Sequence, residues 1–140
     1  MILKNIKYTL FIPIVLTTIF PAITFSNNTN EIKRIVSLNS LGADIVSQLD
    51  NESLIGIPGS SLLKKDNKFV NKVIVSEGRM PPSLEKIIKL KPSLVIGSAG
   101  FHDKILDKLV ELNIEILKTD TKSINQLEIL ISDLSNYLNK

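Results

Sequence analysis

The sequence contains no cysteine and no tryptophan, and its 140 residues include one histidine, His102. The absence of cysteine excludes disulfide bridges, thiolate metal sites and a lipid attached to a cysteine after a signal. One histidine without cysteine cannot hold zinc or manganese on its own, and a lone histidine that opens a helix is more often a surface or capping residue than a catalyst. We therefore expect no resident metal and no cofactor.

The loops that enzymes use for nucleophiles and phosphates are also missing. There is no Gly-x-Ser-x-Gly elbow for a catalytic serine. The stretch Gly56–Gly59 is neither a dinucleotide fingerprint nor a phosphate loop: it lacks the Gly-Lys-Ser/Thr ending, and Pro58 removes a backbone donor. Asp44 and Glu77 have no third acid to complete a magnesium or phospho-acceptor cluster. These absences predict that the protein is not an enzyme, and they disfavour an extracytoplasmic enzyme of flavodoxin-like shape.

The charge balance is close to neutral once the N-terminal segment is set aside. The chain has 17 Lys+Arg and 14 Asp+Glu, and Lys4 and Lys7 lie in a segment without acids. Residues 27–140 then carry 15 basic and 14 acidic side chains, a net charge of +1. This value gives no support to a nucleic-acid partner, which would require a basic face.

The first 26 residues are typical of a secretory signal peptide. Two lysines precede the apolar stretch Tyr8–Phe20, whose 13 residues are fewer than the roughly 20 that a spanning helix needs. Small residues at Thr24 and Ser26 predict cleavage before Asn27, and Ala22 is a second possible site. We predict a signal at 1–26, a linker at 27–32 and one domain at 33–140, with the product in the periplasm. The alternative is an uncleaved N-terminal anchor.

Short apolar runs alternate with helical patterns through the rest of the chain. The runs are continuous, as in a parallel sheet that is covered on both faces, so the sequence predicts an α/β fold with about five parallel strands flanked by helices. Helical spacing places Leu84, Ile87, Ile88 and Leu90 on one apolar face, and a second face consists of Ile105, Leu106, Leu109, Val110 and Leu112. The last helix has Ile124, Leu127, Leu130, Ile131, Leu134 and Leu138 on one face. The predicted strands are Arg34–Leu38, Leu54–Ile57, Lys72–Val75, Ser93–Gly97 and Ile114–Leu117, and the predicted helix caps are Ser40 and Ser83.

Loops at the carboxyl ends of the strands are the candidate ligand site, because ligands of parallel α/β sheets bind there. The loops are Asn39–Ser40, Pro58–Ser61, Ser76–Pro82, Ser98–His102 and Thr119–Thr121. The most polar of them is Glu77–Met80. Chemistry leaves two interpretations of it open: a surface turn with an internal Glu–Arg pair, or the lip of an anion-binding cleft in which Arg79 clamps a carboxylate.

The segment Pro82–Gly97, PSLEKIIKLKPSLVIG, resembles a motif of substrate-binding proteins of ABC importers. The group takes up ferric siderophores, haem or vitamin B12, and its motif usually has aspartate at the position of Ser93. Arg34–Ile45 and Leu54–Ile57 are similar as well. The resemblance extends over Lys33–Asn139 and covers the first lobe of the two-lobe fold.

The resemblance implies a ligand cleft, a docking residue and partners. Glu85 matches the glutamate that docks on arginines of the membrane permease, and Arg79 suits an acidic ligand. The implied ligand is a ferric chelate, haem or cobalamin; the divalent-metal branch, which uses several histidines, is disfavoured. With the second lobe absent, we expect either a truncated or split gene or a partial sequence, and a separately encoded second lobe is a possible partner. The alternative is a non-transporting interaction module or gene remnant. The implied cleft residues are Asn39, Ser40, Ser60, Glu77, Gly78, Arg79, Met80, Ser98, Gly100, Phe101 and His102.

Overall fold

The computed structural model describes residues 32–77 and 80–140. The predicted signal and all but the last residue of the predicted linker lie outside them. Between the described ends, strands and helices alternate: β1 (Ile35–Ser37), α1 (Ser40–Asp50), β2 (Leu54–Gly59), the 3₁₀ turns η1 (Leu63–Lys65) and η2 (Asn67–Phe69), β3 (Val73–Glu77), α2 (Leu84–Lys89), β4 (Leu94–Ser98), α3 (Asp103–Glu111), β5 (Glu115–Thr119) and α4 (Ile124–Leu138). None of the described helices combines the length and the apolar character needed to cross a membrane.

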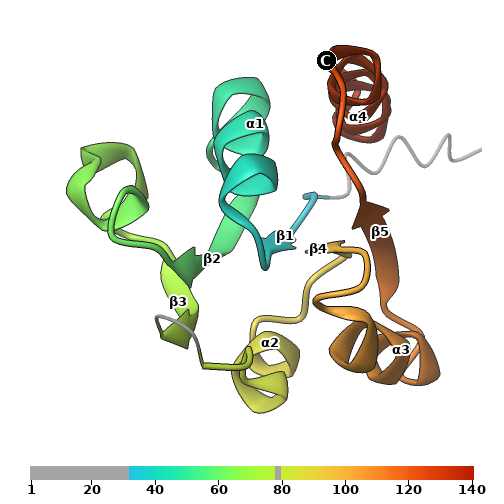
Figure 1. Ribbon diagram of the computed structural model, residues 1–140. Helices are drawn as coiled ribbons and strands as arrows, with labels where there is room; N and C mark the ends of the chain where they lie inside the picture. Colours follow the sequence, from blue (N-terminus) through green and yellow to red (C-terminus); the bar gives the residue numbers. More distant parts are fainter. Residues whose placement is uncertain (1–31, 78–79) are drawn as a thin grey trace, which may run out of the picture. The chain divides into compact units, whose positions relative to one another are not determined.

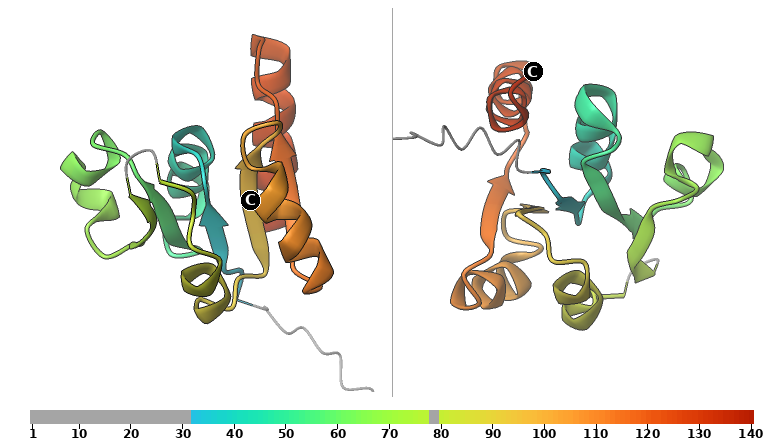
Figure 2. Two further views of the ribbon diagram at one scale, coloured as in Figure 1. Left: turned by 60° about the horizontal axis from the view of Figure 1, so that its bottom comes forward. Right: turned by 180° about the vertical axis from the view of Figure 1, so that it is seen from behind.

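The five strands form one parallel sheet in the order β3-β2-β1-β4-β5. Helices α1 and α4 cover one face, and α2 and α3 cover the other (Figures 1 and 2). The predicted α/β fold with a five-stranded parallel sheet is confirmed. The strand order reverses between β1 and β4, so the connections that follow these two neighbouring strands lead to opposite sides of the sheet.

Each face of the sheet has its own apolar core, because successive side chains of a strand point to opposite faces. Ile35 and Ile96 pack in the core beneath α1 and α4, whereas their neighbours Val36 and Val95 pack beneath α2 and α3. All four are fully buried. This two-sided burial is the physical reason why the strands are continuous apolar runs rather than alternating ones.

Several predicted element ends were wrong. Strands β3 and β5 each continue two residues beyond their predicted ends, and two further differences lie near the carboxyl ends of β1 and β2. The residue that caps α1 is Asn39 rather than Ser40: the Asn39 side chain accepts a hydrogen bond from the Gly42 N–H. Strand β2 continues through Pro58 to Gly59 instead of stopping before the proline. Its register with β3 shifts between Ile57 and Pro58, and such an irregularity accommodates a residue that has no N–H to donate.

The apolar faces of the helices are narrower than predicted. Helix α2 has only six residues and buries Ile87 completely, while its neighbour Ile88 is 41% exposed. In α3 the fully buried residues are Leu106 and Leu109. One helical position turns a side chain by about 100°, so residues that flank the buried stripe face solvent. The residues predicted as inward but found exposed are Ile88, Val110, Leu112, Ile124 and Ile131.

The Pro82–Gly97 motif serves packing at the amino end of the sheet. The Arg34 guanidinium donates to the Leu90 carbonyl at 2.7 Å (Nη2) and, through Nε, to the Lys91 carbonyl at 3.3 Å, which satisfies the end of α2. The Ser93 hydroxyl accepts hydrogen bonds from the Arg34 N–H at 2.9 Å and from the Tyr137 hydroxyl at 3.0 Å. Ser93 therefore ties α4 to the sheet at the end opposite the strand carboxyl ends.

Candidate functional site

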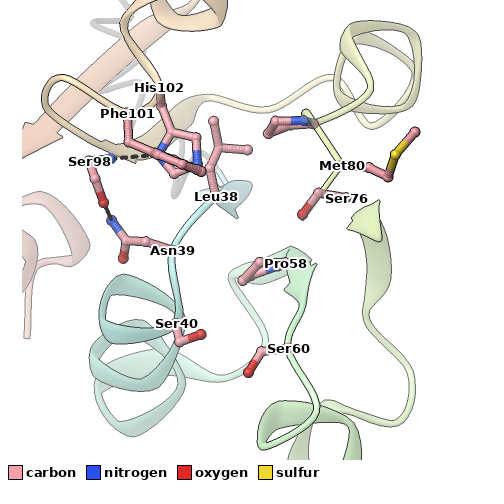
Figure 3. A pocket seen from close by; sticks show the side chains of 11 residues that line it. Leu38, Asn39, Ser40, Pro58, Ser60, Ser76, Met80, Ser98, Phe101 and His102 are labelled. Atoms are coloured by element: carbon pink, nitrogen blue, oxygen red, sulfur yellow. Dashed lines mark hydrogen bonds between the residues drawn. The ribbon is translucent and has the colours of Figure 1, made fainter. Parts of the chain in front are cut away.

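A cavity of about 300 Å³ opens at the carboxyl ends of the strands, where the strand order reverses (Figure 3). This switch-point cavity is surrounded by the loops after β1, β2, β3 and β4. Its volume is at the lower end of the range for small-molecule sites, roughly 300–1,000 Å³. It is lined by Leu38, Asn39, Ser40, Pro58, Ser60, Ser76, Met80, Pro82, Ser98, Phe101 and His102.

Most of the cleft residues implied by the sequence lie together around this cavity. They are Asn39, Ser40, Ser60, Met80, Ser98, Phe101 and His102. Glu77 and Gly100 are not part of the lining, and Gly78 and Arg79 lie outside the residues that the structure describes. The loop after β5 lines a different cavity, together with α4.

One lining residue lay outside the loops that the sequence analysis named: Leu38, which follows β1. Pro58, Ser76 and Pro82 belong to the candidate loops Pro58–Ser61 and Ser76–Pro82, although they were not among the individual cleft residues. The signal for Leu38 was position alone, since it lies at the carboxyl end of a strand, next to the loop Asn39–Ser40.

The Asn39 side chain holds the cavity floor together. Its Oδ1 accepts from the Gly42 N–H at 2.7 Å, and its Nδ2 donates to Ser98 Oγ at 3.1 Å and to Thr119 Oγ1 at 3.0 Å. The Thr119 hydroxyl donates onward to the Gly97 carbonyl. Both amide hydrogens of Asn39 are thereby occupied, so this residue links β1, β4 and β5 and shapes the site rather than donating to a ligand.

His102 is buried in the cavity wall, with 6% of its surface exposed. Its Nδ1 accepts a hydrogen bond from the Ser98 N–H at 2.9 Å, and the His102 N–H donates to the Ser98 carbonyl at 2.9 Å. Burial lowers the pKa of His102 below its ordinary value. The lone histidine is therefore a neutral group that closes the turn after β4. It occupies the N-cap position of α3 without a side-chain capping bond, one of the two positions that its type favoured, whereas the surface position was wrong.

Two large apolar side chains stand at the mouth of the cavity. Phe101 is 78% exposed and Met80 is 68% exposed. The Phe101 and His102 rings pack edge to face, with 4.7 Å between their centroids. The described lining contains serine hydroxyls but no Asp, Glu, Lys or Arg. Such a surface can bury a broad ligand against apolar rims and hydrogen-bond it through hydroxyls.

The two glutamates singled out by the sequence are both paired with lysines. Glu77 lies 3.0 Å from Lys64, and both side chains are about half exposed. Glu85, in the first turn of α2, lies 2.7 Å from Lys89 one turn later, and its side chain is 77% exposed. Exposed pairs of this kind contribute little to stability, so Glu85 can exchange its partner at little cost.

A second groove of about 500 Å³ adjoins the switch-point cavity on the side of α2 and α3, and the sequence analysis did not foresee it. The two share Pro82, Phe101 and His102. His102 is thus part of the wall between them. Within residues 32–77 and 80–140, no group of three acidic, histidine or cysteine side chains is placed to hold a metal ion.

Solved structures that are similar to this chain include binding proteins. An ABC transporter substrate-binding protein from Listeria monocytogenes is 25% identical, with a TM-score of 0.64; the alignment covers 76% of this chain and 40% of that one. The periplasmic vitamin B12 binding protein BtuF of Vibrio cholerae is 28% identical, with a TM-score of 0.64 and coverage of 75% and 41%. SirA of Staphylococcus aureus is 27% identical, with a TM-score of 0.59 and coverage of 74% and 39%.

This chain spans about two fifths of the length of these solved relatives. No curated protein matches it. The family described as periplasmic binding protein matches residues 35–134, which include every described strand and most of α4. Because this match covers more than half of the sequence and the fold agrees with it, the chain belongs to the periplasmic binding protein family, a family of binding proteins rather than enzymes.

Proposed function

We propose that this chain is the N-terminal lobe of the solute-binding component of an ABC importer for an iron complex or a corrinoid. The observation that carries the proposal is the switch-point cavity, which lies at the strand carboxyl ends in a chain of this family. The relative from Vibrio cholerae binds vitamin B12. The family is extracytoplasmic, and a periplasmic location with a cleaved signal at 1–26 is part of the proposal.

The chemistry of the cavity suits a bulky ligand with an apolar surface. Haem and corrinoid macrocycles, and ferric chelates with aromatic arms, present broad faces that Phe101 and Met80 can cover. The serine hydroxyls supply hydrogen bonds at the floor. Arg79, from the loop after β3, is proposed to approach acidic groups of the ligand, as its guanidinium suits carboxylates.

A second lobe is proposed to close the cleft from the other side. One lobe offers contacts from one direction only, so it leaves much of a large ligand in water and binds it weakly. We propose that an ABC permease receives the closed complex. Glu85 on α2 is the proposed docking residue because it is exposed and matches the docking glutamate of the family motif.

The proposal is tested by titrating the full chain with haemin, cyanocobalamin and a ferric catecholate while following the absorbance of each probe. We expect saturable binding of one probe class. Phe101→Ala should weaken binding about tenfold or more. The Phe101 side chain is exposed in the free protein and would be buried by the ligand, and alanine lacks most of this apolar surface. Ile124→Ala is the matched control: Ile124 is 77% exposed, as Phe101 is 78% exposed, but Ile124 lies on α4 away from the cavity.

If no probe binds, either to the full chain or to the chain combined with a second lobe, the transport proposal fails and a non-transporting interaction module becomes the better account. Equal loss of affinity in Phe101→Ala and Ile124→Ala would show that the cavity is not the binding site.

A further inference from the structure

The two ring nitrogens of His102 have different surroundings. Nδ1 faces the Ser98 backbone N–H at 2.9 Å. A backbone N–H can only donate, so Nδ1 must accept and carry no proton. In a neutral imidazole the single proton then resides on Nε2, because the hydrogen bond made by one nitrogen determines the state of the other.

The surroundings of His102 favour this neutral form. The ring is buried in the cavity wall. The nearest carboxylate in sequence, Asp103, is engaged elsewhere: its Oδ2 accepts from the Gly100 N–H at 3.0 Å and its Oδ1 lies 3.4 Å from Lys118 Nζ. No ion pair of His102 occurs among the described residues. A second proton would also put two N–H groups face to face at Ser98.

The Nε2–H group has no protein partner within the part of the chain that the structure describes, and it is not sealed from solvent. Figure 3 shows Nδ1 turned to Ser98 and the other nitrogen on the opposite side of the ring. His102 lines both the switch-point cavity and the adjoining groove. The donor is therefore held by a fixed ring at a surface where a bound molecule would lie.

We propose that His102 donates its Nε2–H to an acceptor oxygen of the ligand and does not coordinate the metal of that ligand. The inference rests on the proposed function and refines it. To ligate a metal, Nε2 would have to lose its proton to Nδ1, where it would oppose the Ser98 N–H at 2.9 Å. That exchange breaks the hydrogen bond of the turn and leaves a buried donor unpaired, which is unfavourable.

The consequence concerns the class of ligand. On the side of the cleft that this lobe forms, a histidine that donates favours complexes in which the chelator itself satisfies the metal and presents carboxylate, amide or phenolate oxygens at its edge. The metal complex is then carried intact, with its coordination unchanged. A complex that requires a protein imidazole as an axial ligand is not accommodated by this wall.

The state of the ring can be measured directly on the ¹⁵N-labelled full chain. His102 is the only histidine, so its two ring nitrogens give the only imidazole signals and need no assignment. We expect the Nε2–H tautomer at neutral pH, and a shift and slower exchange of that proton when a probe binds. An Nδ1–H tautomer in the free protein would overturn the inference.

Haemin is the decisive probe because its iron has an open axial position, and cyanocobalamin is the comparison because its cobalt is already saturated. His102→Phe keeps a flat ring but removes both the Nε2 donor and the Nδ1 acceptor of the Ser98 N–H, and His102→Gln restores an N–H donor together with a carbonyl acceptor. We expect about a tenfold loss of affinity in His102→Phe, corresponding to one hydrogen bond to the ligand, and partial recovery in His102→Gln. The absorption spectrum of bound haemin should be the same in all three proteins.

Two results would overturn the donor role while leaving the proposed function intact. The first is an imidazole-ligated haemin spectrum in the wild type that His102→Phe loses, and the second is unchanged affinity for every probe in His102→Phe. Circular dichroism of the variants checks that they fold. If no probe binds to the wild type, the proposed function fails and the donor role fails with it, while the tautomer measurement still reports on the free ring.

Discussion

Replacing Asn39 should destabilise the protein more than the loss of a single helix cap does. Asn39→Ala removes the cap of α1 and both hydrogen bonds to Ser98 and Thr119. A cap contributes about 1 kcal/mol, with a range of roughly 0.5–2. Each of the two side-chain hydrogen bonds contributes about 1 kcal/mol net. The expected loss is about 3 kcal/mol, a large part of the 5–15 kcal/mol that is typical of a domain.

Two further variants separate the cap from the bridge between strands. Asn39→Ser retains a capping hydroxyl but is too short to reach β4 and β5, so it should lose about 2 kcal/mol. Ser123 caps α4 by accepting from the Gln126 N–H and takes no part in the cavity. Ser123→Ala is therefore the control for a cap alone, with an expected loss of about 1 kcal/mol.

Urea unfolding of the full chain, followed by circular dichroism, measures these differences in the free energy of unfolding. They are obtained from the shift of the midpoint urea concentration when the dependence of the free energy on urea concentration is unchanged. The reasoning is refuted if Asn39→Ala and Ser123→Ala lose the same amount, because the bonds from Asn39 to Ser98 and Thr119 would then contribute nothing. It also fails if Asn39→Ser is as stable as the wild type.

Three further outcomes are expected. Burial lowers the pKa of His102 from 6.5, so the unfolded chain binds the proton more readily than the folded chain. The free energy of unfolding should therefore decline as the pH falls from about 6.5 to the lower pKa of the folded state. Urea titrations of His102→Phe should lack this decline. Glu85→Gln should reduce transport with a cognate permease at unchanged ligand affinity, whereas Glu128→Gln, an exposed acid of α4, should not; equal transport would refute docking. Gly97→Ala should cost about 1–3 kcal/mol in urea unfolding, because a Cβ there would lie 2.9 Å from the fully buried Leu106; wild-type stability would contradict this.

The local sequence pattern was sufficient to predict features that depend only on residues close by in the chain. Ser83 was predicted to cap α2, and its Oγ accepts from the Lys86 N–H. The cap of α1 was assigned one residue late, because both Asn39 and Ser40 are capping types and only the observed hydrogen bond to Gly42 distinguishes them. The breadth of the helical faces was overestimated because apolar type alone does not show whether another element covers a residue: Val110 is apolar but 52% exposed.

The candidate site was accessible to sequence reasoning only as a set of loops. Parallel topology brings carboxyl ends to one edge, and this rule placed Ser60, Ser98 and Phe101 beside each other without any structure. It could not show that Glu77 turns to Lys64, because that pairing depends on where the η1 turn packs. Nor could it show that a lone histidine is buried, since residue type favours the opposite.

The order of strands and helices, the two-sided burial of the strands and membership of the family follow from the sequence, because periodicity and motif spacing are short-range properties of the chain. The strand order β3-β2-β1-β4-β5 and its reversal are properties of the folded molecule. Asn39 meets Ser98 and Thr119, which are 59 and 80 residues away in the chain. Contacts of that separation leave no local signal, and they determine the shape of the cavity. The proton position on His102 depends on the Ser98 N–H only four residues away, but the burial of the ring depends on the folded molecule.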